Sequence, residues 1–238
     1  MKKTVLMVGC NGEIGRTLYK NLCDKYHWIL CDIGENKFCF PNFQQIDVTK
    51  KEDVEKIFAN NKIDAVVSLA GLQWTPDIPS TDLFEKMEKV YFNSTFYLLD
   101  AMRKTGVKKF VFASSNHVTD FFEDNGYSVL GREISIDDYP KSRGIYGTLK
   151  LASESLCHNF FVNCGINTVS FRIGTYRSVI DKNKMPDRWN RTILDDDLLV
   201  MAFCQAIEKE HAHGLFYLVS DNKDKPWNTE SLKDFLKK

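Results

Sequence analysis

The fold is decided by the stretch VLMVGCNGEIGRTL, residues 5–18. It begins with an apolar run that is typical of a buried strand, and it ends with apolar residues at helical spacing. Between them stand Gly9, Gly12 and Gly15. Glycines let the backbone turn sharply and let another group approach without a Cβ in the way. A phosphate group at the positive end of a helix fits such a turn, and the alternative is an ordinary strand-to-helix turn whose glycines relieve crowding.

The size and charge of the chain limit what it can be. Its 238 residues suffice for one sizeable α/β domain. Lysine plus arginine and aspartate plus glutamate number 32 each, so the charge gives no reason to expect a nucleic-acid partner. No segment reaches the roughly 18 apolar residues that a membrane span needs, and residues 1–4 lead into the first expected strand without a cleavage site. We therefore expect a cytoplasmic protein with no membrane partner.

The cysteines and histidines predict no metal site. Seven cysteines occur without a Cys-x-x-Cys pair, which favours buried thiols in a reducing compartment over zinc ligands or a redox pair. The five histidines are scattered along the chain. His211 and His213 stand close together in the polar stretch EKEHAHG, which is typical of a solvated helix end rather than of a ligand pair.

Short apolar runs alternate with amphipathic segments. The expected strands are Thr4–Val8, Trp28–Asp32, Phe43–Asp47, Ala65–Leu69, Lys109–Ser114, Asn167–Arg172 and Leu215–Val219. The expected helices are Glu13–Lys25, Lys51–Asn60, Leu83–Thr105, Tyr146–Cys164, Asp196–Lys209 and Thr229–Leu236. This alternation predicts an α/β fold with a doubly wound parallel sheet, whose ligands bind at the carboxyl ends of the strands. Two long connections, residues 119–146 and 175–192, are expected over that same edge.

Asp32 ends the second expected strand, 17 residues after Gly15. A carboxylate at this place can accept hydrogen bonds from both ribose hydroxyls of the adenosine half of a dinucleotide, and it would repel a 2′-phosphate. No arginine follows in DIGENK, which favours NAD over NADP. The alternative is a surface aspartate in a turn, but the distance from the glycines favours the cofactor.

Two further strand ends carry candidates for cofactor contact. Asp47 and Val48 close the third expected strand, where Asp47 can meet the adenine edge, cap the following helix, or do both. Leu69, Ala70 and Gly71 belong to the stretch SLAGL, which ends the fourth expected strand. Small residues there allow a nucleotide to pass close to the backbone, and they equally suit tight helix–sheet packing.

Tyr146 and Lys150 stand four residues apart, on one face of the helix that follows the first long connection. One such pair can arise by chance in a chain with nine tyrosines, so the context matters. Ser115 lies at the carboxyl end of the strand that precedes this connection. A lysine ammonium beside the phenol favours the phenolate, which predicts a lowered pKa for Tyr146, and a serine hydroxyl opposite would hold the substrate oxygen.

The chain carries the three glycines, the acidic end of the second strand, Ser115, Tyr146-x-x-x-Lys150 and Asn93. Taken together, these features resemble the extended short-chain dehydrogenase/reductase superfamily. The most similar branch is the NAD-dependent epimerase/dehydratase family, and the resemblance runs from the first residue to about residue 173. It implies an NAD-binding Rossmann core. It also implies pairing through the helices that carry Asn93 and Tyr146, hence a homodimer or a higher homo-oligomer.

We accordingly expect an NAD-binding core over residues 1–174. Residues 175–238 are expected to form a short substrate-binding portion that packs on this core and is not an independent domain.

A narrower resemblance is to bacterial uronate dehydrogenases, carried by FVFASSNHV, YGTLKLASE, FRIGTY and an arginine-containing loop before LDDDLLV. Those enzymes oxidise the anomeric carbon of galacturonate or glucuronate to an aldarolactone with NAD. The resemblance implies that Ser115, Asn116 and His117 contact sugar hydroxyls and that Arg188 or Arg191 binds the carboxylate.

The chain also departs from that group. The first long connection is longer, and Leu72-Gln73 stands where the group has a small polar residue. The part after residue 200 is short, which favours a small monosaccharide over a nucleotide sugar.

The expected reaction is hydride transfer from a sugar hydroxyl carbon to NAD, with Tyr146 as the base. Lys150 is expected to hold the nicotinamide ribose and to stabilise the phenolate, and Asn93 is expected to position Lys150 through backbone and water contacts. Two alternatives stay open. One is a sugar epimerase or dehydratase that recycles a retained NAD, and the other is a non-catalytic nucleotide sensor, which would need no proton-transfer set.

The expected site residues form three groups. The catalytic group is Ser115, Tyr146, Lys150 and Asn93. The cofactor group is Gly9, Asn11, Gly12, Glu13, Ile14, Gly15, Asp32, Asp47, Val48, Leu69, Ala70, Gly71, Asn93, Tyr146, Lys150 and Ile173. The substrate group is Gln73, Ser115, Asn116, His117, Tyr146, Thr175, Arg188 and Arg191.

Overall fold

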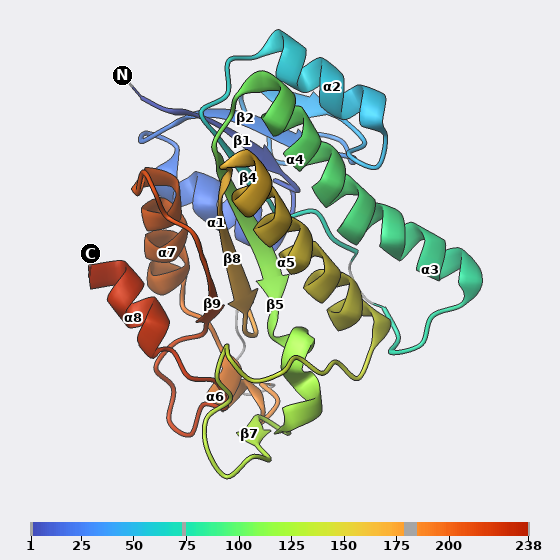
Figure 1. Ribbon diagram of the computed structural model, residues 1–238. Helices are drawn as coiled ribbons and strands as arrows, with labels where there is room; N and C mark the ends of the chain where they lie inside the picture. The colour runs from blue at the N-terminus through green and yellow to red at the C-terminus, as the bar shows by residue number, and fades with distance from the viewer. Residues whose placement is uncertain (1, 73–74, 179–184, 238) are drawn as a thin grey trace.

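The structure is a computed structural model that describes residues 2–72, 75–178 and 185–237. Seven parallel strands form one sheet in the order β3-β2-β1-β4-β5-β8-β9 (Figure 1). The strand order reverses between β1 and β4, which defines a doubly wound Rossmann fold and confirms the predicted fold class. In chain order the elements are β1 (Thr4–Val8), α1 (Glu13–Leu22), β2 (His27–Asp32), β3 (Phe43–Gln45), α2 (Lys51–Asn60), β4 (Ala65–Ser68), α3 (Thr81–Glu88), the π-helical turn η1 (Lys89–Asn93), α4 (Ser94–Thr105), β5 (Lys109–Ser115), the 3₁₀ segment η2 (Asn116–Phe122), β6 (Glu123–Asp124), β7 (Tyr127–Ser128), α5 (Ile145–Cys164), β8 (Asn167–Ile173), α6 (Trp189–Thr192), α7 (Asp196–Glu208), β9 (Gly214–Leu218) and α8 (Glu230–Lys237).

Helices cover both faces of the sheet (Figure 1). On one face α1, α7 and α8 enclose a core that includes the fully buried Leu18 and Phe203. On the other face α2, α4 and α5 enclose a second core, with Leu98 and Phe110 fully buried. Each such side chain stabilises the fold by roughly 1.5–3 kcal/mol, so the two cores fix the sheet and the edge where its strands end. Within the described ranges, no helix combines the length and the hydropathy that a membrane crossing requires.

The predicted strands and helices are present, with ends that differ by a few residues. β3 ends at Gln45 rather than Asp47, because this edge strand pairs with β2 over three residues. The predicted helix 83–105 is two helices, α3 and α4, joined by η1. The π-helical turn is stabilised from outside, since Ser153 Oγ of α5 donates a hydrogen bond to the Tyr91 carbonyl at 2.7 Å.

The two long connections contain short elements that no periodicity indicates. Residues 119–146 include the end of η2 and the two-stranded β6–β7 hairpin, and residues 175–192 include α6. The hairpin turns at Asn125 and Gly126, whose φ values are 47° and 86°. Both values lie in the left-handed region that glycine and asparagine tolerate best.

The C-terminal part of the chain completes the same sheet. β9 pairs in parallel with β8, and α7 and α8 pack on the core that α1 covers. The described residues after 174 therefore share one sheet and one core with those before it. A separate substrate-binding role for residues 175–238 stays a proposal about function.

Candidate active site

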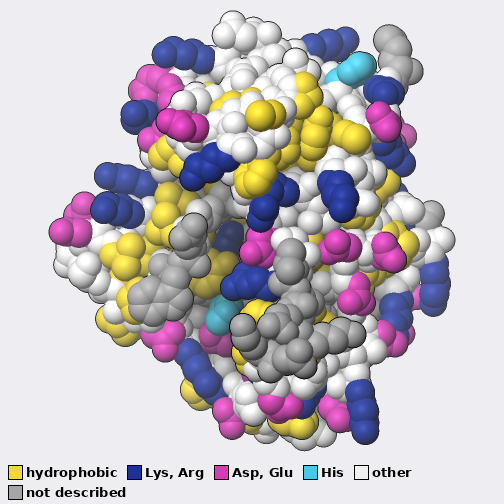
Figure 2. All heavy atoms as spheres, turned by 180° about the vertical axis from the view of Figure 1, so that it is seen from behind, with side chains coloured by type: hydrophobic (Ala, Val, Ile, Leu, Met, Phe, Trp, Pro, Cys, Tyr) yellow, Lys and Arg dark blue, Asp and Glu magenta, His cyan; other side chains and the backbone are white. Residues whose placement is uncertain are grey.

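The carboxyl ends of the strands open into a cavity of about 560 Å³. Its walls come from the segments after β4, β5 and β8, from η1 and from the first turns of α5. Figure 2 shows the molecule from behind relative to Figure 1. A hollow lies near the centre of this view, with basic side chains and a histidine around it. The predicted site residues that line the cavity are Ile14, Leu69, Ala70, Gly71, Ser115, Asn116, His117, Tyr146, Lys150, Ile173, Thr175 and Arg188.

The glycine turn between β1 and α1 is packed too closely for side chains. Gly9 has a φ of +83°, and a Cβ on it would lie 2.8 Å from the carbonyl carbon of Leu69. A Cβ on Gly15 would lie 2.7 Å from the Cα of Cys10. Gly12 is exposed and is the N-cap of α1. The positive end of this helix is therefore open to a ligand at the carboxyl end of β1. These residues fit the diphosphate of a dinucleotide.

Asp32 lies beside this turn. Its two carboxylate oxygens accept hydrogen bonds from the backbone N–H groups of Asn11 and Gly34, each at 3.0 Å. Asn11 also donates from Nδ2 to the Glu35 carbonyl, and its buried Oδ1 has no partner among the described residues. The carboxylate is thus held at the end of β2 with acceptor capacity left, and the unpartnered Oδ1 is a second acceptor. Both fit the hydroxyls of a ribose.

Three other predicted cofactor residues make local contacts. Glu13 accepts a hydrogen bond from the backbone N–H of Ser178, which ties α1 to the second long connection. Asp47 accepts from the Thr49 N–H at 3.0 Å and from the Thr49 hydroxyl at 2.7 Å, and Val48 is buried in the core under α2. The carboxylate of Asp47 therefore caps its own turn, and contact with an adenine stays a proposal.

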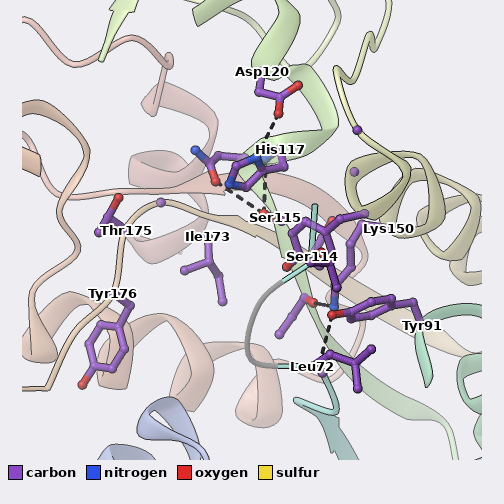
Figure 3. Close-up of a pocket in the computed structure, with 18 of the residues that line it drawn as sticks. Leu72, Tyr91, Ser114, Ser115, His117, Asp120, Lys150, Ile173, Thr175 and Tyr176 are labelled. Carbon is purple, nitrogen blue, oxygen red and sulfur yellow. Dashed lines mark hydrogen bonds and ion pairs between the residues drawn. The ribbon is translucent and has the colours of Figure 1, made fainter. Parts of the chain in front are cut away.

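Lys150 lines the cavity, although only 4% of its surface is exposed. Its ammonium donates a hydrogen bond to the Ala113 carbonyl at 2.7 Å (Figure 3). The Nζ atom lies 4.8 Å from the ring centre of Phe112, 5.1 Å from that of Tyr91 and 6.0 Å from that of Tyr146. Burial lowers the pKa of Lys150 to about 8, and the nearby carboxylate of Glu154 opposes this shift.

The side chains of Tyr146 and Ser115 both line the cavity and form a hydrogen bond with each other. Burial raises the pKa of Tyr146, and a hydrogen bond with Ser115 opposes that rise. This differs from the predicted lowering of the Tyr146 pKa by Lys150. The Lys150 ammonium is bound to the Ala113 carbonyl, and burial outweighs the contact with Ser115.

Tyr91, rather than Asn93, contacts the predicted catalytic pair. The rings of Tyr91 and Tyr146 meet edge to face with centres 5.1 Å apart. The Tyr91 hydroxyl accepts a hydrogen bond from the Leu72 N–H at 2.9 Å (Figure 3). Asn93 ends η1 but does not line the cavity, and no hydrogen bond joins it to Lys150 among the described residues. Its predicted role, to position Lys150 through backbone and water contacts, stays a prediction.

Asn116 and His117 follow Ser115 at the start of η2. The side chain of Asn116 is buried, and its Nδ2 has no hydrogen-bond partner among the described residues. His117 Nδ1 lies 2.9 Å from Asp120 Oδ2. This contact favours a proton on Nδ1 and leaves Nε2 as an acceptor. The cavity thus offers one unpartnered donor and one oriented imidazole to a polar ligand.

The structure separates the two candidate arginines. Arg188 lines the cavity, and its guanidinium donates to the buried carboxylate of Glu123 and, at 3.2 Å, to the Thr175 hydroxyl. Arg191 does not line the cavity. It pairs with Asp187, and its guanidinium lies 3.9 Å from the ring centre of Tyr127. Of the two, Arg188 is placed to meet a ligand.

Tyr91, Glu123 and Arg177 are among the site residues that the sequence did not indicate. Gln73, a predicted substrate residue, lies outside the described residues. Tyr91 stands two positions before Asn93 in the predicted helix 83–105. The sequence therefore indicated the correct helix but not Tyr91 itself. Glu123 and Arg177 fall in the long connections, where no pattern distinguishes them. Arg177 lines the cavity, and its guanidinium lies 5.7 Å from the ring centre of Trp189.

The fold and the site define a dinucleotide-binding enzyme class built on the Rossmann fold, with a Tyr-x-x-x-Lys pair at the carboxyl ends of the strands. The model of the NAD dependent epimerase/dehydratase family matches residues 5–231. The chain belongs to this family, and its cofactor is NAD.

Individual relatives agree with this assignment. The chain is 37% identical over 230 residues to the uncharacterised protein YtbQ of Bacillus subtilis (strain 168), covering 96% of this chain and 90% of that one. It is 28% identical to a uronate dehydrogenase of Pseudomonas syringae pv. tomato, covering 94% of this chain and 77% of that one. The crystal structure of a uronate dehydrogenase from Agrobacterium tumefaciens superposes with a TM-score of 0.82 at 23% identity, covering 98% of this chain and 83% of that one. That superposition confirms the fold.

Proposed function

We propose that this chain is an NAD-dependent dehydrogenase that oxidises a CH–OH group of a small sugar acid. The proposed substrate is a uronic acid, galacturonate or glucuronate, which is oxidised at its anomeric carbon to the aldarolactone. The observation that carries the proposal is the place of Arg188, whose fixed guanidinium lines the same cavity as Tyr146 and Lys150. The similarity to a uronate dehydrogenase of Pseudomonas syringae supports it.

Arg188 is held in a way that suits carboxylate recognition. Its Nε and Nη2 donate to Glu123, and its Nη1 donates to Thr175. A guanidinium has five N–H donors, so each terminal nitrogen keeps one N–H for another acceptor. Two N–H groups in a fixed plane match the two oxygens of a carboxylate. A neutral sugar would gain less from this arrangement than a sugar acid.

The other residues are given roles that fit the family resemblance and their places in the cavity. The Ser115 hydroxyl, beside Tyr146, orients the substrate hydroxyl. Tyr146 accepts the proton of that hydroxyl, and the ammonium of Lys150 stabilises the phenolate and binds the nicotinamide ribose. The unpartnered Nδ2 of Asn116 donates to another sugar hydroxyl, and Nε2 of His117 accepts from one. NAD supplies the acceptor for the hydride that leaves the carbon.

The proposal is tested by incubating the protein with NAD and single sugars while NADH absorbance is followed. We expect NADH to accumulate with galacturonate or glucuronate and to accumulate far more slowly with galactose or glucose. Product formed without net NADH would replace the proposal with an epimerase or dehydratase. NAD binding without turnover of any sugar acid would contradict it and favour a nucleotide sensor.

A further inference from the structure

We propose that Glu154 and Arg172 are positioning residues, a buried ion pair that holds Lys150 and Tyr146 of α5 in register against the end of β5. The proposal rests on the proposed function, because it assigns this pair a part in the same proton transfer. Neither residue lines the substrate cavity.

Three side chains on one face of α5 meet three successive residues at the end of β5. Lys150 donates to the Ala113 carbonyl at 2.7 Å, and Glu154 accepts from the Ser114 hydroxyl at 2.5 Å. The third pair is Tyr146 with Ser115. Since Tyr146, Lys150 and Glu154 follow at intervals of four residues, a shift of Glu154 along the strand would move the other two with it.

Arg172 fixes Glu154 from the neighbouring strand. Its Nε and Nη2 donate to the two carboxylate oxygens of Glu154 at 3.0 and 2.8 Å. Arg172 stands beside Ser114 in the register of β5 with β8, and beside Tyr217 in that of β8 with β9. Ser114, Arg172 and Tyr217 therefore lie side by side on three neighbouring strands. The ion pair forms on the face of the sheet that α5 covers (Figure 1).

Further hydrogen bonds lead from Arg172 to η2, the segment that carries predicted substrate residues. Arg172 Nη1 donates to the Tyr217 hydroxyl at 3.3 Å, and that hydroxyl lies 2.7 Å from the hydroxyl of Thr119. Thr119 belongs to η2, the segment that presents Asn116 and His117 to the cavity. One hydrogen-bonded chain thus joins the helix that carries the proton acceptor to the segment proposed to hold the sugar.

Stability alone does not explain this pair. The side chains of Arg172 and Glu154 are 2% and 7% exposed, so both charges are removed from water. The cost of that desolvation generally cancels most of the attraction, and apolar residues of the same volume are often equally stable. The charge on Glu154 does, however, act on Lys150 one helical turn away.

Among the residues that the structure describes, few charged groups face the ammonium of Lys150. The groups that face it are the rings of Phe112 from β5 and of Tyr91 from η1, together with Tyr146, Glu154 and Cys157 from α5, with Arg172 of β8 behind Glu154. Burial lowers the pKa of Lys150 to about 8, while Glu154 and Cys157 oppose the shift. Removing the charge of Glu154 lowers this pKa further, so Lys150 would lose its proton at a lower pH.

The test measures Lys150 directly, by NMR titration of the protein with ¹³Cε-labelled lysine, with Lys150→Met to assign the signal. Glu154→Gln keeps the shape of the side chain and an acceptor for Ser114. We expect it to lower the titration midpoint of Lys150 by about one pH unit, as loss of an opposite charge one helical turn away does. The alkaline limb of kcat/KM against pH should move down with it.

Glu154→Gln leaves Arg172 without its charged partner, so the variant can fail to fold. The double variant Glu154→Gln with Arg172→Met removes both charges and should also lower the midpoint, but by less than Glu154→Gln alone, because the positive charge of Arg172 that disfavours the Lys150 ammonium is removed as well. Glu154→Asp should restore it in part. As a matched control, Leu22→Ala opens a cavity in the core on the opposite face of the sheet from α5, and it should lower the Tm without moving the midpoint.

An unchanged Lys150 midpoint in folded Glu154→Gln and in the double variant would overturn the inference. If the midpoint moves but no sugar is oxidised by the unmodified protein, the proposed function fails and the influence of Glu154 on Lys150 stands.

Discussion

The rings of Tyr91 and Tyr146 meet edge to face, with their centres 5.1 Å apart and their planes at 67°. Tyr91 comes from the π-helical turn before α4, and Tyr146 comes from the first turn of α5. The ammonium of Lys150 lies 5.1 Å from the ring centre of Tyr91, within the range of a cation–π interaction. Tyr91 thus touches both members of the proposed catalytic pair and also holds Leu72 through its hydroxyl.

Replacing Tyr91 separates these two contacts. Tyr91→Leu removes the ring beside Lys150, and we expect kcat/KM to fall about tenfold because a desolvated cation–π contact contributes up to ~2 kcal/mol. Tyr91→Phe keeps the ring and loses the bond to Leu72, so its loss should be smaller. Steady-state kinetics of both variants measure the difference. Equal losses would show that the ring contact with Lys150 does not matter.

Arg188 is predicted to read the charge of the substrate. Arg188→Ala should raise KM for a uronate roughly 10- to 100-fold while changing KM for a neutral sugar little, since a charged hydrogen bond contributes ~1.5–3 kcal/mol. Glu123→Gln is combined with it, because the buried carboxylate would otherwise lose its positively charged partner. Arg191→Ala is the control and should lower the Tm without raising KM. Equal effects on acid and neutral sugars would contradict the assignment.

Asp32 is predicted to exclude a 2′-phosphate. Asp32→Asn keeps the shape of the side chain and removes its charge, so NADP should bind at least about tenfold more tightly than to the unmodified protein, and NAD should bind more weakly. Isothermal titration calorimetry measures both affinities. Asp234→Asn is the comparison, and it should leave both affinities unchanged because its carboxylate lies on α8 and is not among the residues that line the cavity. An unchanged preference in Asp32→Asn would refute the role of Asp32.

The glycine turn is predicted to tolerate no side chain at Gly15. A Cβ there would lie 2.7 Å from Cys10, so Gly15→Ala should destabilise the fold by about 1–3 kcal/mol, the cost of an overpacked site, and weaken NAD binding. Gly34→Ala meets its nearest atoms at 3.5 Å and serves as the control. Urea unfolding of both variants gives the free energies, and equal stability would contradict the close packing.

The fold could be predicted because its pattern is local. β1 and α2 were predicted to the residue, since an apolar run and helical spacing fix them. The π-helical turn could not be predicted, because the apolar pattern runs unbroken from α3 into α4. It depends on a tertiary hydrogen bond from Ser153 to the Tyr91 carbonyl.

Some residues of the candidate site could be placed from the sequence, and others could not. Tyr146 and Lys150 are identified by their spacing, and Ser115 by its place at the end of a strand. The choice between Arg188 and Arg191 was open in the sequence, because it depends on how α6 turns within a long connection. Glu123 gave no signal, since its role arises from its contact with Arg188, 65 residues away along the chain.

The most direct test of the account is Tyr146→Phe, assayed with a sugar acid that the unmodified protein oxidises. The variant keeps the ring and loses the phenol oxygen, which accepts the proton when it is ionised to the phenolate. We expect kcat to fall by about 10²- to 10⁴-fold, the usual contribution of a general base, while the affinity for NAD measured by calorimetry stays the same. A variant that keeps most of its turnover would contradict the assignment of Tyr146 as the base.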